Sequence, residues 1–208
     1  MLIVGLTGSI GMGKSTAAQH LVARRIPVID ADALVHRLYS GSLAGAIETA
    51  FPGTTVDGAV DRARLSAALA AQPESFARLE AIVHPAVRVA ERAKLQALSR
   101  RGEPVAVLEI PLLFETGADG LVDQTIVVTT DAATQRMRVL ARPGMTGDKL
   151  DSILARQMPD AEKRRRADFV VDTSGPVEDT RAQIDDILAR LPGLPAHAFA
   201  RHWSEGGA

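Results

Sequence analysis

Residues 2–16 read Leu-Ile-Val-Gly-Leu-Thr-Gly-Ser-Ile-Gly-Met-Gly-Lys-Ser-Thr, a short apolar run that leads into a glycine-rich turn. The turn from Gly8 to Ser15 matches G-x-x-x-x-G-K-[ST], the pattern of the phosphate-binding P-loop. The alternative is a glycine-rich turn that precedes Lys-Ser by chance. The context argues against it, because an apolar strand comes before the turn and an amphipathic helix follows, with apolar side chains at Ala17, Ala18, Leu21 and Val22.

Each residue type in this turn has a chemical role. Glycines at 8, 11 and 13 allow positive φ and turn backbone N–H groups inward, where they form a cradle for phosphate oxygens with the helix N-terminus. Lys14 supplies positive charge to the β- and γ-phosphates of ATP, and Ser15 offers a hydroxyl to Mg²⁺. The residues that we expect to bind ATP are Gly8, Gly11, Met12, Gly13, Lys14, Ser15 and Thr16.

The composition of the 208 residues limits the class of protein. Hydrophobic residues make up 46%, enough for a sizeable core, but aromatic residues only 3%, so aliphatic side chains must fill it. The formal net charge of −1 gives no sign of a nucleic-acid or membrane partner. The lack of cysteine excludes disulfides and thiol catalysis. No stretch is apolar enough to span a membrane, and we expect a cytoplasmic monomer.

Apolar runs alternate with helical patterns along the chain, which predicts an α/β fold with a parallel sheet between two layers of helices. Ligands of such folds bind at the carboxyl ends of the strands. The predicted strands are residues 2–7, 26–30, 105–110, 124–130 and 169–171. Residues 33–101 read as mostly helical, without a good strand, and the helix starts expected there are Asp61, Pro73 and Pro85.

Carboxylates follow two of the predicted strands. Asp30 and Asp32 come after the second strand, where a carboxylate would orient an acceptor hydroxyl and take its proton. Asp32 is the better candidate, since Asp30 could belong to the strand end. The alternative is two solvated carboxylates, one of them a helix N-cap. Glu109 closes the third strand, where it could order a metal-bound water or have no role.

A run of basic residues surrounds residues 142–166, between two predicted strands. A helical segment flanked by arginines suits a lid that brings positive charge to a transferring phosphoryl group. The alternative is a solvated basic helix face. Arg142 is the strongest candidate, because it lies at the Pro-Gly break where a lid would hinge. The basic residues are Arg136, Arg138, Arg142, Arg156, Lys163, Arg164, Arg165 and Arg166, and surface placement is expected for at least two of the last three.

Several separated stretches together resemble one family, the dephospho-CoA kinases. They occur in the family order and cover about residues 2–175. The P-loop alone is shared by many kinases, whereas the Asp-Ala-Asp, His-Pro and Pro-Leu-Leu-Phe-Glu segments together are far more specific. The matching stretches are residues 5–8 with the P-loop, 27–32, Asp61 and Arg62 with Leu65, 79–85, 110–115, 140–142, Gln157, and Ala167 with Asp168.

The resemblance implies transfer of the ATP γ-phosphate to the ribose 3′-hydroxyl of dephospho-CoA, the final step of coenzyme A biosynthesis. By position, Lys14 is catalytic, Asp32 is the base for the acceptor hydroxyl, and Arg142 is the lid arginine on the phosphates. His84 could also be an ordinary cap-region histidine. The residues that fall around the acceptor pocket are Arg62, His84, Pro111, Leu112 and Leu113.

The resemblance also implies a core like that of nucleoside monophosphate kinases, with five parallel strands. The expected parts are a core of residues 1–32, 102–141 and 167–191, a helical acceptor-binding lobe of residues 33–101, a lid of residues 142–166, and a tail of residues 192–208 that is loosely ordered or packed as an appendage. Three positions depart from the family pattern: Ser9, Met12 and Pro143 replace a glycine, a serine and an acidic residue.

Two other functions remain open at this point. One is another P-loop kinase that phosphorylates a nucleoside monophosphate or a sugar acid. The other is a nucleotide-dependent switch or binding module that hydrolyses ATP slowly and signals through the helical lobe. The Asp-Ala-Asp and Pro-Leu-Leu-Phe-Glu segments count against the switch, and the chain has no Asn-Lys-x-Asp guanine-reading motif.

Overall fold

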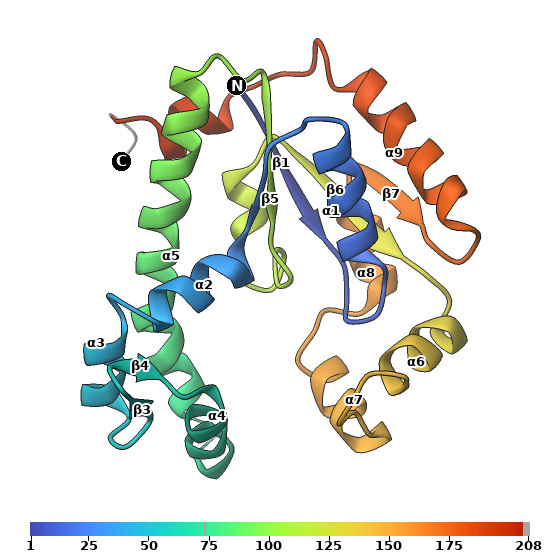
Figure 1. Ribbon diagram of the computed structural model, residues 1–208. Helices are drawn as coiled ribbons and strands as arrows, with labels where there is room; N and C mark the ends of the chain where they lie inside the picture. The colour runs from blue at the N-terminus through green and yellow to red at the C-terminus, as the bar shows by residue number, and fades with distance from the viewer. Residues whose placement is uncertain (73, 206–208) are drawn as a thin grey trace. The chain divides into compact units, whose positions relative to one another are not determined.

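The computed structural model describes residues 1–72 and 74–205 (Figure 1). The chain divides into two compact units, one of Met1–Ile29 with Leu95–Ala208 and one of Asp30–Lys94. Helix α5, Ser75–Arg100, runs from the second unit into the first. None of the described helices is long and apolar enough to cross a membrane.

The first unit is built on a five-stranded sheet in the order β2-β5-β1-β6-β7. The central strand β1, Leu2–Thr7, is buried along its whole length and pairs in parallel with β5, Val105–Glu109, and with β6, Gln124–Thr129. The outer strands are β7, Phe169–Asp172, which pairs in parallel with β6, and β2, Val28–Asp30, beside β5. The predicted α/β fold class with a five-stranded parallel sheet is confirmed.

Both faces of β1 are covered. Leu2, Val4 and Leu6 pack on one face against helices α1, Lys14–Ala23, and α9, Val177–Arg190. On the other face, a Cβ at Gly5 would lie 2.9 Å from Leu113 Cδ2, so the segment after β5 packs against the strand. A strand buried on both sides reads as a continuous apolar run, which is why β1 is so clear in the sequence.

Three short helices follow β6. They are α6, Ala132–Leu140, α7, Gly147–Leu154, and α8, Asp160–Arg166. Asp131 caps α6 by accepting the N–H of Thr134, as predicted, and hydrogen bonds from Thr134 lower the pKa of the Asp131 carboxyl. Thr146 caps α7 in the same way, through the N–H of Lys149.

The described part of the tail packs onto the first unit. Trp203 is 2% exposed, and its indole N–H donates to the carbonyl of Leu121 at 2.8 Å, at the end of the short helix η1, Ala118–Leu121. Asp123 Oδ1 accepts the N–H groups of His197 and Ala198, just before the helical turn η2, Phe199–Trp203. Of the two states left open for the tail, the described residues show the packed appendage.

In its described residues, the second unit has four helical segments around its own apolar cluster. These are α2, Ala31–Tyr39, α3, Ala44–Ala50, α4, Arg62–Ala71, and the first part of α5. Ile47, Leu65 and Val83 are among its buried members. Asp61 caps α4 as predicted, by accepting the N–H groups of Ala63 and Arg64.

Two sequence predictions for this unit are wrong. A hairpin of β3, Thr55–Val56, and β4, Ala59–Val60, interrupts the block in which no strand was expected. Its turn residues Asp57 and Gly58 both have positive φ, which suits a tight hairpin, but two-residue strands are too short to show a periodicity.

Pro85 was expected in the first turn of a new helix, but it lies inside α5. The proline removes one backbone hydrogen bond. Val83 and Val87, on either side of it, are both buried in the cluster of the second unit, and a continuous helix keeps both there. The other expected helix start, Pro73, lies outside the described residues.

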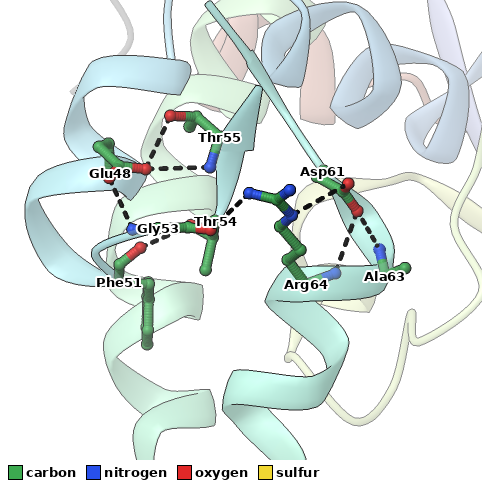
Figure 2. A network of polar contacts seen from close by, with 8 residues as sticks. All are labelled: Glu48, Phe51, Gly53, Thr54, Thr55, Asp61, Ala63 and Arg64. Carbon is green, nitrogen blue, oxygen red and sulfur yellow. Dashed lines mark hydrogen bonds and ion pairs between the residues drawn. The ribbon is translucent and has the colours of Figure 1, made fainter. Parts of the chain in front are cut away.

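A glutamate holds the hairpin to α3 (Figure 2). Glu48 Oε1 accepts the N–H of Gly53 at 2.6 Å, and its Oε2 accepts the N–H and hydroxyl of Thr55 at 2.9 and 2.7 Å. These hydrogen bonds, that of Gly53 first, lower the pKa of the Glu48 carboxyl below its ordinary value. The charged form of Glu48 therefore stabilises the hairpin.

We predict that Glu48→Gln destabilises the chain at neutral pH and that the deficit shrinks in acid. Because the folded state lowers the pKa of Glu48, its contribution is complete above the unfolded-state pKa and is lost as pH falls through the folded-state pKa. Urea unfolding of both proteins from about pH 7 to about pH 3 measures this. A deficit that stays constant over that range would contradict the role of the charged carboxylate.

Candidate active site

The P-loop connects β1 to α1, and its glycines serve two different needs. Gly11 and Gly13 have φ of 81° and 87°, in the left-handed region that favours glycine. Gly8 does not have positive φ, which corrects that part of the sequence prediction. This position requires glycine because there is no room for a side chain: a Cβ there would lie 2.4 Å from Val128 Cγ2 and 2.7 Å from the Val128 carbonyl oxygen.

Side chains far along the chain hold the loop in shape. The Ile10 N–H donates to Gln157 Oε1 at 3.2 Å, and Gln135 Nε2 donates to the Ile10 carbonyl at 2.8 Å. Thr173 Oγ1 donates to the Met12 carbonyl at 2.9 Å. Sequence reasoning missed Gln135 and Thr173. The sequence marks both residues only weakly. Each is a polar residue at a position where the apolar pattern of the helix or strand predicts a buried side chain.

The loop leaves donors available for an anion. Among the residues that the structure describes, no acceptor takes the backbone N–H groups of Gly13, Lys14 and Ser15. Lys14 Nζ lies 2.5 Å from Glu109 Oε1, at the end of β5, and both side chains are largely buried. Ser15 is exposed at the start of α1, so its hydroxyl is accessible. Such a set of N–H groups at a helix N-terminus binds phosphate.

Met12 contributes differently from the glycines around it. Its side chain is 3% exposed and packs in the core beside β1, and its Sδ accepts the N–H of Thr130. Its own N–H donates to the carbonyl of Ser9. Met12 therefore anchors the loop to the sheet, and its predicted contact with ATP stays a prediction.

The two aspartates after β2 have different local roles. Asp30 is the N-cap of α2 and accepts the N–H of Ala33 at 3.1 Å, so the capping alternative holds for this residue. Asp32 lies in the first turn of α2 with an exposed side chain. Arg62, first in α4, and His84 in α5 are also exposed and belong to the second unit with Asp32.

The basic residues that follow β6 fall into two groups, those paired with carboxylates nearby in sequence and those without such a pair. Arg164 pairs with Asp160, and Arg165 and Arg166 both pair with Glu162, so the basic end of α8 is largely neutralised within the helix. Arg138 donates to Thr173. Arg142, after the last turn of α6, is exposed, and its side chain makes no hydrogen bond or ion pair with any described residue.

The segment after β5 lies next to the base of the P-loop. The Pro111 carbonyl accepts the hydroxyl of Thr7, the last residue of β1, at 3.0 Å. Pro111 and Leu112 are partly exposed, whereas Leu113 is buried against β1. A contact of Leu113 with an acceptor, as the resemblance implies, remains a prediction.

We predict that Gly8→Ala costs about 1–3 kcal/mol of folding stability, because the added methyl group must displace Val128. ADP affinity should fall as well, since the P-loop starts at this residue. Gly45→Ala, in α3, is the matched control: a Cβ there meets no atom within 4 Å, so stability stays unchanged or rises by up to about 1 kcal/mol. Urea unfolding and ADP titration measure both, and equal behaviour of the two variants would contradict the crowding at Gly8.

Comparison with known proteins adds independent information. The family model described as dephospho-CoA kinase matches residues 2–179. The dephospho-CoA kinase of Rhodopseudomonas palustris (strain BisB18) is 57% identical over 195 residues, which are 94% of this chain and 98% of the relative. A crystal structure of TT1252 from Thermus thermophilus is 38% identical, with a TM-score of 0.80 over 92% of this chain and 98% of that one.

Dephospho-CoA kinase from Campylobacter jejuni has the same fold, with a TM-score of 0.68 at 24% identity over 91% of this chain and 96% of that one. The family match covers the P-loop, the segment after β5 and all three short helices after β6. The sequence resemblance is thus confirmed, and this chain belongs to the dephospho-CoA kinase family.

Proposed function

We propose that this chain transfers the γ-phosphoryl group of ATP to the ribose 3′-hydroxyl of dephospho-CoA and releases CoA and ADP. The observation that carries the proposal is the P-loop of a member of this kinase family, in which no described residue accepts the N–H groups of Gly13, Lys14 and Ser15. Relatives that are more than half identical over almost the whole chain are named dephospho-CoA kinase. ATP is the phosphoryl donor that such a kinase requires.

The residues of the P-loop bind and orient the triphosphate. The N–H groups of Gly13, Lys14 and Ser15 donate to phosphate oxygens, and Lys14 moves its charge from Glu109 toward the β- and γ-phosphates. Asp32 accepts the proton of the acceptor hydroxyl. Arg142 supplies charge to the phosphoryl group as it transfers, because no ion pair with a described residue holds its side chain.

Magnesium fits the donor set at this loop. Among the described residues no group of three or more histidines and carboxylates could hold a metal ion. Mg²⁺ at a nucleotide does not need one, because it keeps several waters and takes phosphate oxygens with one or two protein ligands. The Ser15 hydroxyl is one such ligand, and Glu109 would order a metal-bound water. The bound ion would neutralise charge on the β- and γ-phosphates.

Other features of the proposal come from the sequence. Arg62, His84 and the segment Pro111, Leu112 and Leu113 are proposed to border the acceptor. The lobe, lid and tail boundaries, the monomeric state and the cytoplasmic location also stay predictions.

The primary experiment measures ADP release from Mg-ATP with and without dephospho-CoA, and identifies the product by mass spectrometry. We expect acceptor-dependent ADP release and the gain of one phosphate on dephospho-CoA. ADP release that ignores this acceptor would overturn the proposal. A panel of nucleoside monophosphates and sugar acids would then test for another kinase, and slow hydrolysis with every acceptor would favour a switch.

We predict that Asp32→Asn lowers kcat by about 10²- to 10⁴-fold, because the amide accepts no proton from the acceptor hydroxyl. ATP affinity should change little. Asp30→Asn is the matched control, since asparagine caps a helix as well as aspartate does, and it should retain activity. Steady-state kinetics compare the two, and an active Asp32→Asn enzyme would remove Asp32 from its role as base.

We predict that Arg142→Ala lowers kcat by about 10³-fold or more, the effect typical of an arginine that stabilises the transferring phosphoryl group. Arg165→Ala is the control, because its side chain is 74% exposed and already paired with Glu162. It should change kcat by less than about 3-fold, in line with the small energies of exposed ion pairs. If Arg142→Ala behaves like this control, Arg142 is a surface residue.

A further inference from the structure

Lys163 is a charged side chain in an unusual place. It lies in the middle of α8, next to three exposed arginines, and yet its side chain is 0% exposed. Its Nζ lies 2.8 Å from Glu115 Oε1 and 3.5 Å from the carbonyl oxygen of Pro111. A lysine is almost never fully buried unless it is paired, so this ion pair is what allows Lys163 into the interior.

The ion pair joins several parts of the first unit. Glu115 Oε1 also accepts the N–H of Met158 at 2.8 Å, and the Pro111 carbonyl also accepts the hydroxyl of Thr7. Lys163 and Glu115 thus link the end of β1, the segment 111–115 and the segment 158–163. The hydrogen bond between Thr7 and Pro111 lies at the end of β1 from which the P-loop starts.

The segment that carries Lys163 also forms hydrogen bonds with the P-loop and with the end of β6. Gln157 accepts the N–H of Ile10 in the P-loop, and Asp160 accepts the hydroxyl of Thr129 at the end of β6. Residues 157–163 therefore contact the P-loop at one end and the segment 111–115 at the other. Any shift of this segment would move the proposed acceptor side relative to the phosphates.

Stability alone does not explain the buried pair. Buried ion pairs often give no more stability than apolar side chains of similar volume. Here Glu115 Oε2 is buried and has no hydrogen-bond partner among the described residues, which is an additional cost. Compared with apolar packing, the ion pair and its hydrogen bonds fix the distance and the angle between the two segments that they join.

We propose that Lys163 and Glu115 are positioning residues that hold the segment 111–115 at the distance from the P-loop that phosphoryl transfer requires. The inference rests on the proposed function, in which Pro111, Leu112 and Leu113 border the acceptor. Their role is to position and not to bind substrate, since the Lys163 side chain is fully buried and that of Glu115 is 15% exposed. Displacement of reacting groups by about 1 Å costs about 10²-fold in rate, so a small loss of registration becomes measurable.

The test uses the full chain with three variants, Lys163→Met, Glu115→Gln and the double variant. Lys163→Met alone leaves Glu115 charged and without its cation, so it should lose stability. The double variant removes both charges together, so its unfolding midpoint should return toward that of the wild type. Arg165→Met is the control, because it removes an exposed cation from the same helix.

In the double variant we expect kcat/KM for dephospho-CoA to fall by about 10- to 100-fold, whereas the affinity for ADP stays within about 3-fold of wild type. The share of ATP that is hydrolysed without transfer should rise, because water competes with a displaced acceptor. Arg165→Met should show none of these changes. If the double variant does not fold, the same readouts on Glu115→Gln decide, since its amide oxygen still accepts the Met158 N–H.

Two results would overturn the positioning role. One is a folded double variant whose kcat/KM for dephospho-CoA and hydrolysed share match those of the wild type. The other is a loss of ADP affinity as large as the loss in kcat/KM, which would indicate general damage to the P-loop. If the wild type itself transfers no phosphate to dephospho-CoA, the proposed function fails, and the inference falls with it.

Discussion

A phosphate site made of backbone N–H groups requires that these groups form no hydrogen bonds within the protein. The contacts around the P-loop in the first unit meet this requirement. Left alone, the N–H groups of a loop find partners within the chain. Here Gln135 and Thr173 donate to the carbonyls of Ile10 and Met12, while no acceptor in the described part of the chain takes the N–H groups from Gly13 to Ser15. The positive φ of Gly11 and Gly13 maintains this arrangement in the backbone.

The basic residues near this site differ in whether a nearby carboxylate pairs with them, and this pairing decides which of them can act on a ligand. Three adjacent arginines in α8 are paired with Asp160 and Glu162 of the same helix. Lys163, between these arginines and Glu162 in sequence, turns inward to Glu115. Arg142 stands apart, because its exposed side chain has no such partner in the described part of the chain. Residues of the same charge thus have three roles: the arginines of α8 are surface charges, Lys163 forms an internal ion pair, and Arg142 is available to a ligand.

Local signals predicted the larger part of the fold and the P-loop at the centre of the candidate site. The P-loop, the strands buried on both faces and the caps at Asp61 and Asp131 all follow from residues close together in sequence. Contacts between distant residues were not predictable in this way: Gln135 lies 125 residues from Ile10, and Thr173 lies 161 residues from Met12. The sequence pattern explained Gly8 by backbone freedom, whereas the structure shows a need for space, because the crowding comes from Val128 in a strand 120 residues away. The hairpin was missed because its two-residue strands are too short to show a periodicity. Pro85 was misread because the packing of Val83 and Val87 keeps α5 continuous in spite of the local preference of proline.

The burial of Trp203 has a practical consequence for spectroscopy. The chain contains one tryptophan and one tyrosine, and they lie in different units, Trp203 in the first and Tyr39 at the end of α2 in the second. Indole fluorescence, excited beyond the phenol band, therefore reports on the tail and the sheet unit alone, since the helical unit holds the tyrosine and not the tryptophan. Compared with far-ultraviolet circular dichroism, which follows the helices of both units, this fluorescence shows without a label whether the two parts melt together or in sequence.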